Sequence, residues 1–155
     1  MGKVLKPLSN IDIDKIMEKH NIKNYRGTYS KDMLPKRINN SESMIINLQD
    51  YFNGGGTHWT AIYNDKNSNV IEYFDSFGLK PPIDCIDYMK TSNKPIEYNS
   101  SQIQNIDSIM CGYYCCYYIT ERYKGRKPID ILLDFNQRPS LCNEVFIRDF
   151  AREIV

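Results

Sequence analysis

The residues that could do chemistry in this chain of 155 residues gather around Cys111. The sequence there changes from a polar stretch, with an Asp-Ser pair suited to a turn, to an apolar and aromatic run that ends at Tyr123. This change predicts that Cys111 opens a buried helix, where unpaired N–H groups and the helix dipole favour a thiolate. Cys111 is therefore a candidate nucleophile. The side-chain amide of Gln104, seven residues earlier, could join the helix N–H groups in stabilising an oxyanion.

A cysteine nucleophile needs a base, and the chain has two histidines. His20 is explained by the end of a predicted helix, where the dipole favours a basic residue, so His58 is the candidate base. Because the residues after His58 and those at 70–76 both read as strands joined by a turn, they predict a hairpin. A turn centred near residues 66–67 would place His58 opposite Asp75 on one face. Asp75 would then orient the imidazole, and the imidazolium would stabilise the Cys111 thiolate.

Each of these residues also has an ordinary structural explanation. A Cys at the start of an apolar helix is more often a core residue, a His after a glycine run is more often structural, and an Asp at a strand end usually caps a turn. Gln104 alone is an ordinary polar loop residue. Their joint arrangement favours catalysis. A zinc site is the rival reading, but Cys111, Cys115 and Cys116 on one helical turn do not provide the usual C-x2-C pair, so no metal site is predicted.

The bulk properties suit one ordinary domain over residues 1–155. A net charge of +1 gives no reason to expect nucleic acid or membrane partners. The sequence contains neither an apolar run of about 18 residues nor a signal-peptide h-region, so we expect no membrane contact and an intracellular, non-secreted protein. Five cysteines are an odd number in a chain large enough to fold without staples, which favours free thiols.

Hydrophobic periodicity and turn residues predict an α+β fold with a central mixed β-sheet flanked by helices. Residues 1–8 are expected to be a frayed leader and residues 25–35 a long surface loop. The expected strands cover residues 43–48, 58–63, 70–76 and 94–99. The expected helices cover residues 11–20, 83–90, 111–123, 129–135 and the segment from a Ser140 cap to the C-terminus.

Several motifs in fixed order resemble adenain, the adenovirus-type maturation protease, within the wider group of Ulp1-like (papain-like) cysteine peptidases. They are Asn-Gly-Gly-Gly-Thr-His58-Trp59, Tyr-Phe-Asp75-Ser-Phe-Gly78, and Gln104 followed by Cys111-Gly-Tyr-Tyr-Cys-Cys116. Gly27-Thr28-Tyr29-Ser30-Lys31 resembles a further element of that family. The likeness spans residues 24–124 and suggests a virus, a virophage or a virus-like transposon as the source.

The resemblance implies a role for each site residue. Cys111 would attack the scissile carbonyl, His58 would be its base and Asp75 would orient His58. Gln104 and the Cys111 backbone N–H would form the oxyanion hole. Trp59 would pack beside the site and contact substrate, although a core aromatic explains it equally well.

The resemblance also implies a function. The expected enzyme is a cysteine endopeptidase that cleaves capsid or core precursors at small-residue, often Gly-rich, sites during virion maturation. Gly55 and Gly56 would then line a narrow substrate channel. The protein would be a monomer that acts in the virion and the infected cell, in a cytoplasmic virus factory or the nucleus. A deconjugating protease for ubiquitin-like proteins and a non-catalytic capsid-associated module are the alternatives.

No cofactor is expected to be required, although activation by a capsid-derived peptide or by DNA stays open. The chain has Asp75 where adenain has Glu, and it has no cysteine near Asn93, where adenain forms a disulfide with its activating peptide; Cys85 does not align. The resemblance therefore does not extend to a disulfide-linked activator. A weak DNA site could use a basic cluster that more often marks a solvated helix end: Arg122, Lys124, Arg126 and Lys127.

Overall fold

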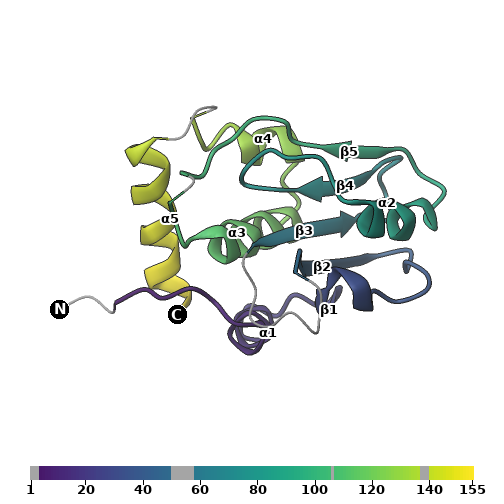
Figure 1. Ribbon diagram of the computed structural model, residues 1–155, viewed down its shortest axis with the longest axis horizontal. Coiled ribbons are helices and arrows are strands. Elements are labelled where there is room, and N and C mark those ends of the chain that lie inside the picture. The colour runs from purple at the N-terminus through teal and green to yellow at the C-terminus, as the bar shows by residue number, and fades with distance from the viewer. Residues whose placement is uncertain (1–3, 50–57, 106, 137–139) are drawn as a thin grey trace.

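A five-stranded sheet forms the centre of the computed structural model, which describes residues 4–49, 58–105, 107–136 and 140–155 (Figure 1). The strand order is β1-β2-β3-β4-β5. Neighbouring strands are antiparallel in the middle of the sheet, at β2–β3 and β3–β4, and parallel at both edges. The predicted α+β class with a mixed sheet is thereby confirmed. The strands are β1 Tyr25–Ser30, β2 Glu42–Asn47, β3 Trp59–Asn64, β4 Ile71–Phe74 and β5 Ile96–Tyr98.

Helices cover both faces of the sheet, because alternate residues of its strands point to opposite sides. Ile45 joins a core beneath α3, whereas its neighbours Met44 and Ile46 join a second core beneath α2. The core beneath α3 also contains residues of α1, α4 and α5, so four helices share that face. The helices are α1 Asn10–Lys19, α2 Ile83–Lys90, α3 Cys111–Tyr123, α4 Pro128–Leu132 and α5 Leu141–Ile154, and a 3-10 turn covers Lys31–Met33.

The helix that begins at Cys111 is the most deeply buried of the five helices in the part of the chain that the structure describes. Every residue of α3 is buried except Glu121 and Tyr123, as its apolar and aromatic composition predicts. It lies along β3 in the middle of the sheet (Figure 1). Lys124 is its C-cap and Gly125, with φ of +99°, ends it. The predicted limits of this helix are confirmed.

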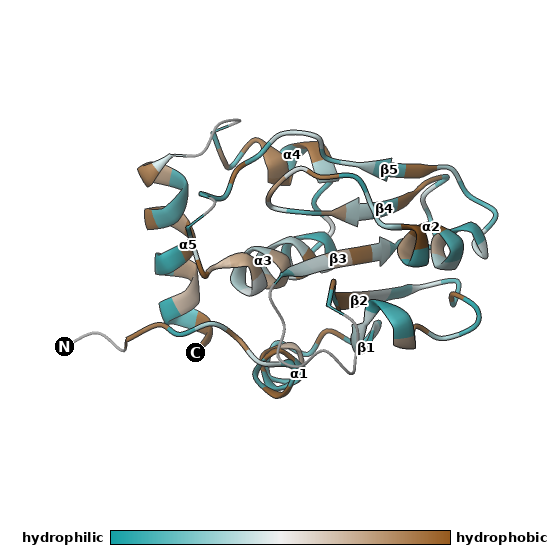
Figure 2. Ribbon diagram, in the orientation of Figure 1, coloured by the Kyte–Doolittle hydropathy of each residue, from teal (hydrophilic) through white to brown (hydrophobic). Residues whose placement is uncertain are grey.

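The capping residues read from the sequence begin the first and last helices. The Ser9 hydroxyl accepts a hydrogen bond from the backbone N–H of Asp12, and the Ser9 backbone N–H donates one to the Asp12 carboxylate, which makes a capping box. Ser140 caps α5 by accepting from the backbone N–H of Asn143. Figure 2 shows both hydrophilic and hydrophobic residues along α5, and its buried side packs against α3. Among the described residues, none of the helices combines the length and hydropathy that a bilayer span needs.

Two expectations about irregular segments are wrong. Residues 25–30 are not a loop but the half-buried edge strand β1, because they pair in parallel with β2 despite a register irregularity next to Gly27. Within the expected leader, Leu8 is buried, because its side chain packs on Gly112 and its carbonyl accepts the indole N–H of Trp59. The fourth helix, α4, is also shorter than expected and ends at Leu132.

Candidate active site

His58 and Asp75 meet where β3 begins and β4 ends. Nε2 of His58 lies 2.7 Å from Oδ1 of Asp75. A carboxylate can only accept, so Nε2 carries the donated proton and the neutral ring has its lone pair on Nδ1. The predicted proximity of the two residues is therefore present in the structure.

The register that brings them together differs from the predicted one. Ala61 pairs with Phe74 in the hairpin, and extending that register by three residues places His58 opposite Phe77 rather than Asp75. The two-residue shift preserves side-chain parity, so Asp75 remains on the same face. The direct opposition of His58 and Asp75 was wrong because the turn is centred one residue later than expected. His58 instead stacks on Phe77, with ring centroids 4.4 Å apart.

Asp75 is fully buried and held by backbone hydrogen bonds on both sides. The side chain of Asn99, just after β5, accepts from the Asp75 N–H at 3.0 Å and donates to the Asp75 carbonyl at 2.6 Å. Oδ1 also accepts the backbone N–H of Phe77 at 2.8 Å. The backbone N–H of Gly78 donates to the Asp75 carbonyl and closes the turn. These contacts leave the carboxylate one orientation in which to meet His58.

The imidazole of His58 is largely buried, with 12% of its side chain exposed. Burial alone lowers the pKa of His58, but its interactions with Asp75 and with Cys111 outweigh this and raise the pKa to about 9. Nδ1 makes no hydrogen bond within the described residues. It is therefore the ring atom left to exchange a proton with the Cys111 sulfur.

Cys111 lies at the first position of α3, as predicted. The backbone N–H groups of Tyr113 and Tyr114 both donate to the carbonyl of Met110, and these are the first hydrogen bonds of the helix. The N–H groups of Cys111 and Gly112 precede them and have no acceptor within the helix, so they can serve a thiolate or an oxyanion.

Gly112 allows the start of α3 to approach its neighbours closely. A Cβ on Gly112 would lie 3.2 Å from two atoms of the Leu8 side chain and 3.4 Å from Trp59. The N-terminal segment and β3 therefore set the position of the helix end that carries Cys111.

Gln104 is fully buried and both ends of its amide are engaged. Ser76 donates from its hydroxyl to Oε1 of Gln104, and its carbonyl accepts the backbone N–H of Gln104 at 3.0 Å. Nε2 of Gln104 donates to the carbonyl of Ser108 at 2.9 Å. Because Nε2 has two hydrogens, one is left for an oxyanion. Asp75 and Gln104 are thus linked through Ser76, the residue that follows Asp75.

Of the three residues predicted to contact substrate, the structure describes only Trp59. Trp59 is 5% exposed and donates its indole N–H to the Leu8 carbonyl at 3.1 Å, so the alternative explanation as a core aromatic fits it better than substrate contact. Gly55 and Gly56 lie outside the described residues.

The predicted basic cluster is mostly engaged in ion pairs. Arg122 is 6% exposed and makes a two-pronged contact with Glu72. Arg126 pairs with Asp134 and Glu121, which also pairs with Lys124. Folding therefore places carboxylates beside these three cations. Weak DNA binding by the cluster stays a prediction.

The remaining sulfur atoms show no sign of a second site. All five cysteines are free, and burial raises the pKa of Cys85 to about 12. Among the described residues no group of three or more His, Cys, Asp or Glu is arranged to hold a metal ion.

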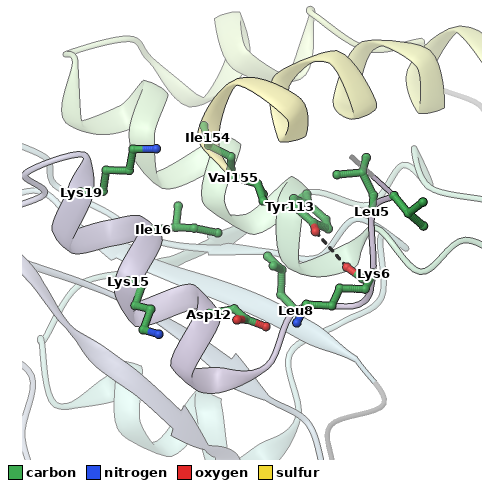
Figure 3. A pocket seen from close by; sticks show the side chains of 11 residues that line it. Leu5, Lys6, Leu8, Asp12, Lys15, Ile16, Lys19, Tyr113, Ile154 and Val155 are labelled. Atoms are coloured by element: carbon green, nitrogen blue, oxygen red, sulfur yellow. Dashed lines mark hydrogen bonds between the residues drawn. The ribbon is translucent and has the colours of Figure 1, made fainter. Parts of the chain in front are cut away.

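A cavity of about 290 Å³ lies between α1, the segment before it and the end of α5 (Figure 3). Its walls are mainly apolar, and Tyr113 donates to the Lys6 carbonyl at its edge. None of the four candidate catalytic residues lines this cavity, so it is separate from the site at Cys111.

Sequence reasoning missed the residues that hold the site in place. Ser76 and Phe77 stand inside the motif that contains Asp75, and a correct hairpin register would have indicated Phe77. Asn99 and Glu144 act across 24 and 36 residues of sequence, through Asp75 and Ser108 respectively. No local pattern predicts such contacts.

Comparison with known proteins adds independent information. No family model matches the chain. A protein named SUMO-1 cysteine protease from African swine fever virus (isolate Pig/Kenya/KEN-50/1950) is 30% identical over 134 residues, which cover 75% of this chain and 49% of that protein. A candidate thiol protease of Acanthamoeba polyphaga mimivirus is 29% identical over 157 residues, covering 92% of this chain and 45% of the relative. The chain spans about half the length of these curated relatives.

The crystal structure of the African swine fever virus pS273R protease superposes on this chain with a TM-score of 0.65 at 18% identity, covering 90% of this chain and 65% of the protease. The chain shares the fold of that viral protease. A selenomethionine form of the same protease gives a TM-score of 0.56 at 23% identity, over 74% of this chain and 44% of the other. The likeness to viral cysteine proteases confirms the coarser part of the predicted resemblance, and its adenain-specific part stays a prediction.

Proposed function

We propose that the chain is a cysteine endopeptidase whose single domain covers residues 1–155. One observation carries the proposal: Nε2 of His58 donates to buried Asp75 at 2.7 Å, which leaves Nδ1 for the sulfur at the mouth of α3. This is the arrangement that a thiol nucleophile needs for activation. The viral relatives named as cysteine or thiol proteases support the same class of enzyme.

The proposed reaction follows from these groups. The Cys111 thiolate attacks the scissile carbonyl carbon, and the carbonyl π electrons move onto the oxygen. The N–H of Cys111 and the free hydrogen of Gln104 Nε2 stabilise that oxyanion. His58 then gives its proton to the leaving amine as the C–N bond breaks. His58 then takes a proton from water, and the resulting hydroxide adds to the thioester carbonyl. The C–S bond breaks, which releases the carboxylic acid and returns the Cys111 thiolate beside protonated His58.

Labelling and cleavage together test this proposal. At pH 6, iodoacetamide should modify Cys111 faster than the exposed Cys142, because His58 still holds its proton and stabilises the thiolate. Cys111→Ala should abolish peptide cleavage with little change in stability, whereas Cys142→Ala should leave cleavage unchanged. Modification of Cys111 no faster than that of Cys142 would contradict the proposal and favour a non-catalytic, capsid-associated module.

For the substrate we propose capsid or core precursors, cleaved at small-residue, Gly-rich sites during virion maturation. The adenain resemblance and the viral origin of the relatives support this choice, which places the protein in the virion and the infected cell. Incubation with the virus's own precursor proteins, followed by mass spectrometry of the new termini, would reveal the sites. Cleavage only after large or charged residues would contradict it.

A second candidate is removal of ubiquitin-like proteins. The African swine fever virus relatives named SUMO-1 cysteine protease favour it. Hydrolysis of a SUMO C-terminal fluorophore conjugate at least tenfold faster than of a matched short Gly-Gly peptide would support this candidate, because it would require recognition of the folded modifier.

Peptide or DNA activation, a monomeric state and weak DNA binding stay predictions. The ion pairs of Arg122, Arg126 and Lys124 weaken the argument for DNA. Cleavage rates with and without duplex DNA at low salt would test it.

A further inference from the structure

Asn105 and Ser108, which lie between Gln104 and Cys111, hydrogen-bond to Glu144 in the first turn of α5. This carboxylate is 7% exposed. It accepts hydrogen bonds from the Ser108 hydroxyl at 2.9 Å, the Tyr114 hydroxyl at 3.2 Å and, more weakly, the Asn105 N–H at 3.4 Å. Resting on the proposed cysteine peptidase function, we propose that Glu144 is a positioning residue that holds the two oxyanion-hole donors, Gln104 and the start of α3, in place.

Ser108 transmits the effect of Glu144 in two directions. Its carbonyl accepts Nε2 of Gln104 at 2.9 Å, which sets where the second Nε2 hydrogen points. Its hydroxyl oxygen accepts the backbone N–H of Met110, the N-cap of α3, at 3.1 Å. Since an ionised carboxylate can only accept, Glu144 forces the Ser108 hydroxyl to donate toward α5 and to keep a lone pair for Met110.

The contacts around Glu144 reach both the residue before Gln104 and the helix that begins at Cys111. The adjacent Asn143, also buried, donates to the carbonyl of Ile103, directly before Gln104, at 3.0 Å. Tyr114, which donates to Glu144, lies three residues after Cys111 in α3. The first turn of α5 therefore fixes the loop where it leaves Gln104 and where it enters the helix of the nucleophile.

Packing alone does not account for this residue. Removing a carboxylate from water costs free energy that burial of a leucine would not, unless hydrogen bonds compensate it. The Glu144 carboxylate accepts hydrogen bonds from residues near Gln104 and Cys111, which lie outside its own helix. Glu144 therefore serves to place the oxyanion-hole donors, because stabilisation of an oxyanion depends on where its donors lie.

Glu144→Gln tests the role, because the amide keeps the shape but turns a donor toward groups that need an acceptor. We expect kcat for a peptide substrate to fall at least tenfold with KM changed less than threefold. The affinity for a peptide aldehyde, whose adduct with Cys111 also needs the oxyanion hole, should fall by a similar factor. The iodoacetamide rate of Cys111 should stay within twofold, since that displacement forms no oxyanion.

Two further variants make the test specific. Glu153→Gln makes the same change at an exposed position of α5 and should leave all three measurements at the wild-type values. Ser108→Ala removes the hydroxyl that joins Glu144 to Met110 and should reproduce the Glu144→Gln pattern. It tests the same link if Glu144→Gln does not fold.

The possible outcomes separate this inference from the proposed function. Wild-type values of kcat and aldehyde affinity in both Glu144→Gln and Ser108→Ala would overturn it, and so would a parallel loss of alkylation, which would indicate general damage to the site. A wild-type protein that alkylates normally but cleaves no peptide and binds no aldehyde would overturn the proposed peptidase function and this inference with it.

Discussion

His58 lies flat against Phe77, with their ring planes inclined by 18° and their centroids 4.4 Å apart. Phe77 lies in the turn that begins at Asp75, so one short segment supplies both the carboxylate at the edge of the imidazole and an apolar wall at its face. The wall limits rotation of the imidazole about its hydrogen bond to Asp75. It also helps to exclude water from that bond.

Phe77→Ala should therefore lower kcat/KM by roughly twofold to tenfold, since such ring pairs contribute about 0.5–1.5 kcal/mol beyond their buried area. Phe77→Tyr keeps the ring and should retain most of the activity. Steady-state kinetics of the two variants measure the effect. Equal losses in both would show that stacking is not what matters.

Asp75→Asn should move the pH range in which the site works. Without the carboxylate, the pKa of His58 should fall from about 9 toward 6.5, so that the imidazolium and its partner thiolate are lost at lower pH. The amide can also turn its NH2 group toward the ring and impose the wrong tautomer, so cleavage should fall at least about 100-fold. The pH dependence of iodoacetamide labelling follows the ion pair without requiring turnover.

The matched control for this change is Asp87→Asn, an exposed position on α2. It should leave both the labelling profile and the cleavage rate at wild-type values. An Asp75→Asn profile that overlays the wild-type profile would mean that Asp75 does not set the charge of His58.

The raised pKa of His58 also predicts how stability depends on pH. The folded state holds this proton up to a pKa of about 9, whereas the unfolded chain releases it near the ordinary value of 6.5. The stabilisation is therefore fully present below about pH 6.5 and is lost as pH rises through 9; its upper bound is roughly 3 kcal/mol.

Urea unfolding of the wild-type protein and of His58→Gln at pH 6.5, 8 and 9.5 measures the contribution of His58 and the groups coupled to it, because groups remote from His58 titrate alike in both. The wild-type advantage should shrink steadily across the series. A difference in free energy of unfolding that is constant with pH would show that His58 does not gain a proton on folding.

The sequence predicted most of the candidate site because its chemistry is local. A polar loop, a cysteine and an apolar run specify the N-terminus of α3, and Lys124 followed by Gly125 specifies its end. The hairpin was right in kind but shifted by two residues, since its turn contains several residues that can occupy the bend: Asp65, Asn67, Ser68 and Asn69. Because a shift of two residues keeps both side chains on the same face of the sheet, His58 and Asp75 still form a hydrogen bond.

What the sequence could not predict depends on tertiary contacts. Residues 25–30 have the glycine and polar content of a loop, and become β1 only because β2 offers a parallel edge. Arg122 belongs to a run of cations that looks solvated, but the helix turns it inward onto Glu72 of β4, 50 residues away. In both cases the prediction used neighbours in the sequence, whereas contacts with residues distant in the sequence determine the structure.

Gly78 has a backbone angle and close neighbours that leave no room for a side chain. Its φ is +71°, and a Cβ there would lie 2.7–2.9 Å from backbone atoms of Ser100 and Ser101, which cannot move aside as a side-chain tip can. Gly78→Ala should therefore destabilise the fold by about 2–5 kcal/mol, the sum of the left-handed backbone cost and overpacking.

Gly125→Ala is the matched control, because Gly125 has φ of +99° but nothing within 4 Å of the added methyl group. It should cost only the backbone part, about 1–2 kcal/mol. Equal losses of unfolding free energy in the two variants would mean that the segment at Ser100 and Ser101 yields to the new methyl group.

Arg122 should prove to be a structural cation. It donates from Nε and Nη2 to the two carboxylate oxygens of Glu72, at 2.7 and 2.8 Å, and both residues are buried. Arg122→Met would leave Glu72 as an unpaired buried charge and should cost about 3–5 kcal/mol of unfolding free energy. Lys124→Met, the same change at a 64% exposed side chain, should stay within about 1 kcal/mol.

The double variant Arg122→Met, Glu72→Leu distinguishes lost pairing from lost packing. Removing both charges also removes the desolvation cost, so most of the single-variant loss should return. The Tyr118 hydroxyl, which donates to Glu72 at 2.7 Å, would then lack its acceptor, so the recovery should stop short of the wild-type value. If the double variant were instead less stable than Arg122→Met, the pair would stabilise the fold beyond cancelling its own burial, and the guanidinium of Arg122 over the ring of Tyr63 would be the next contact to test.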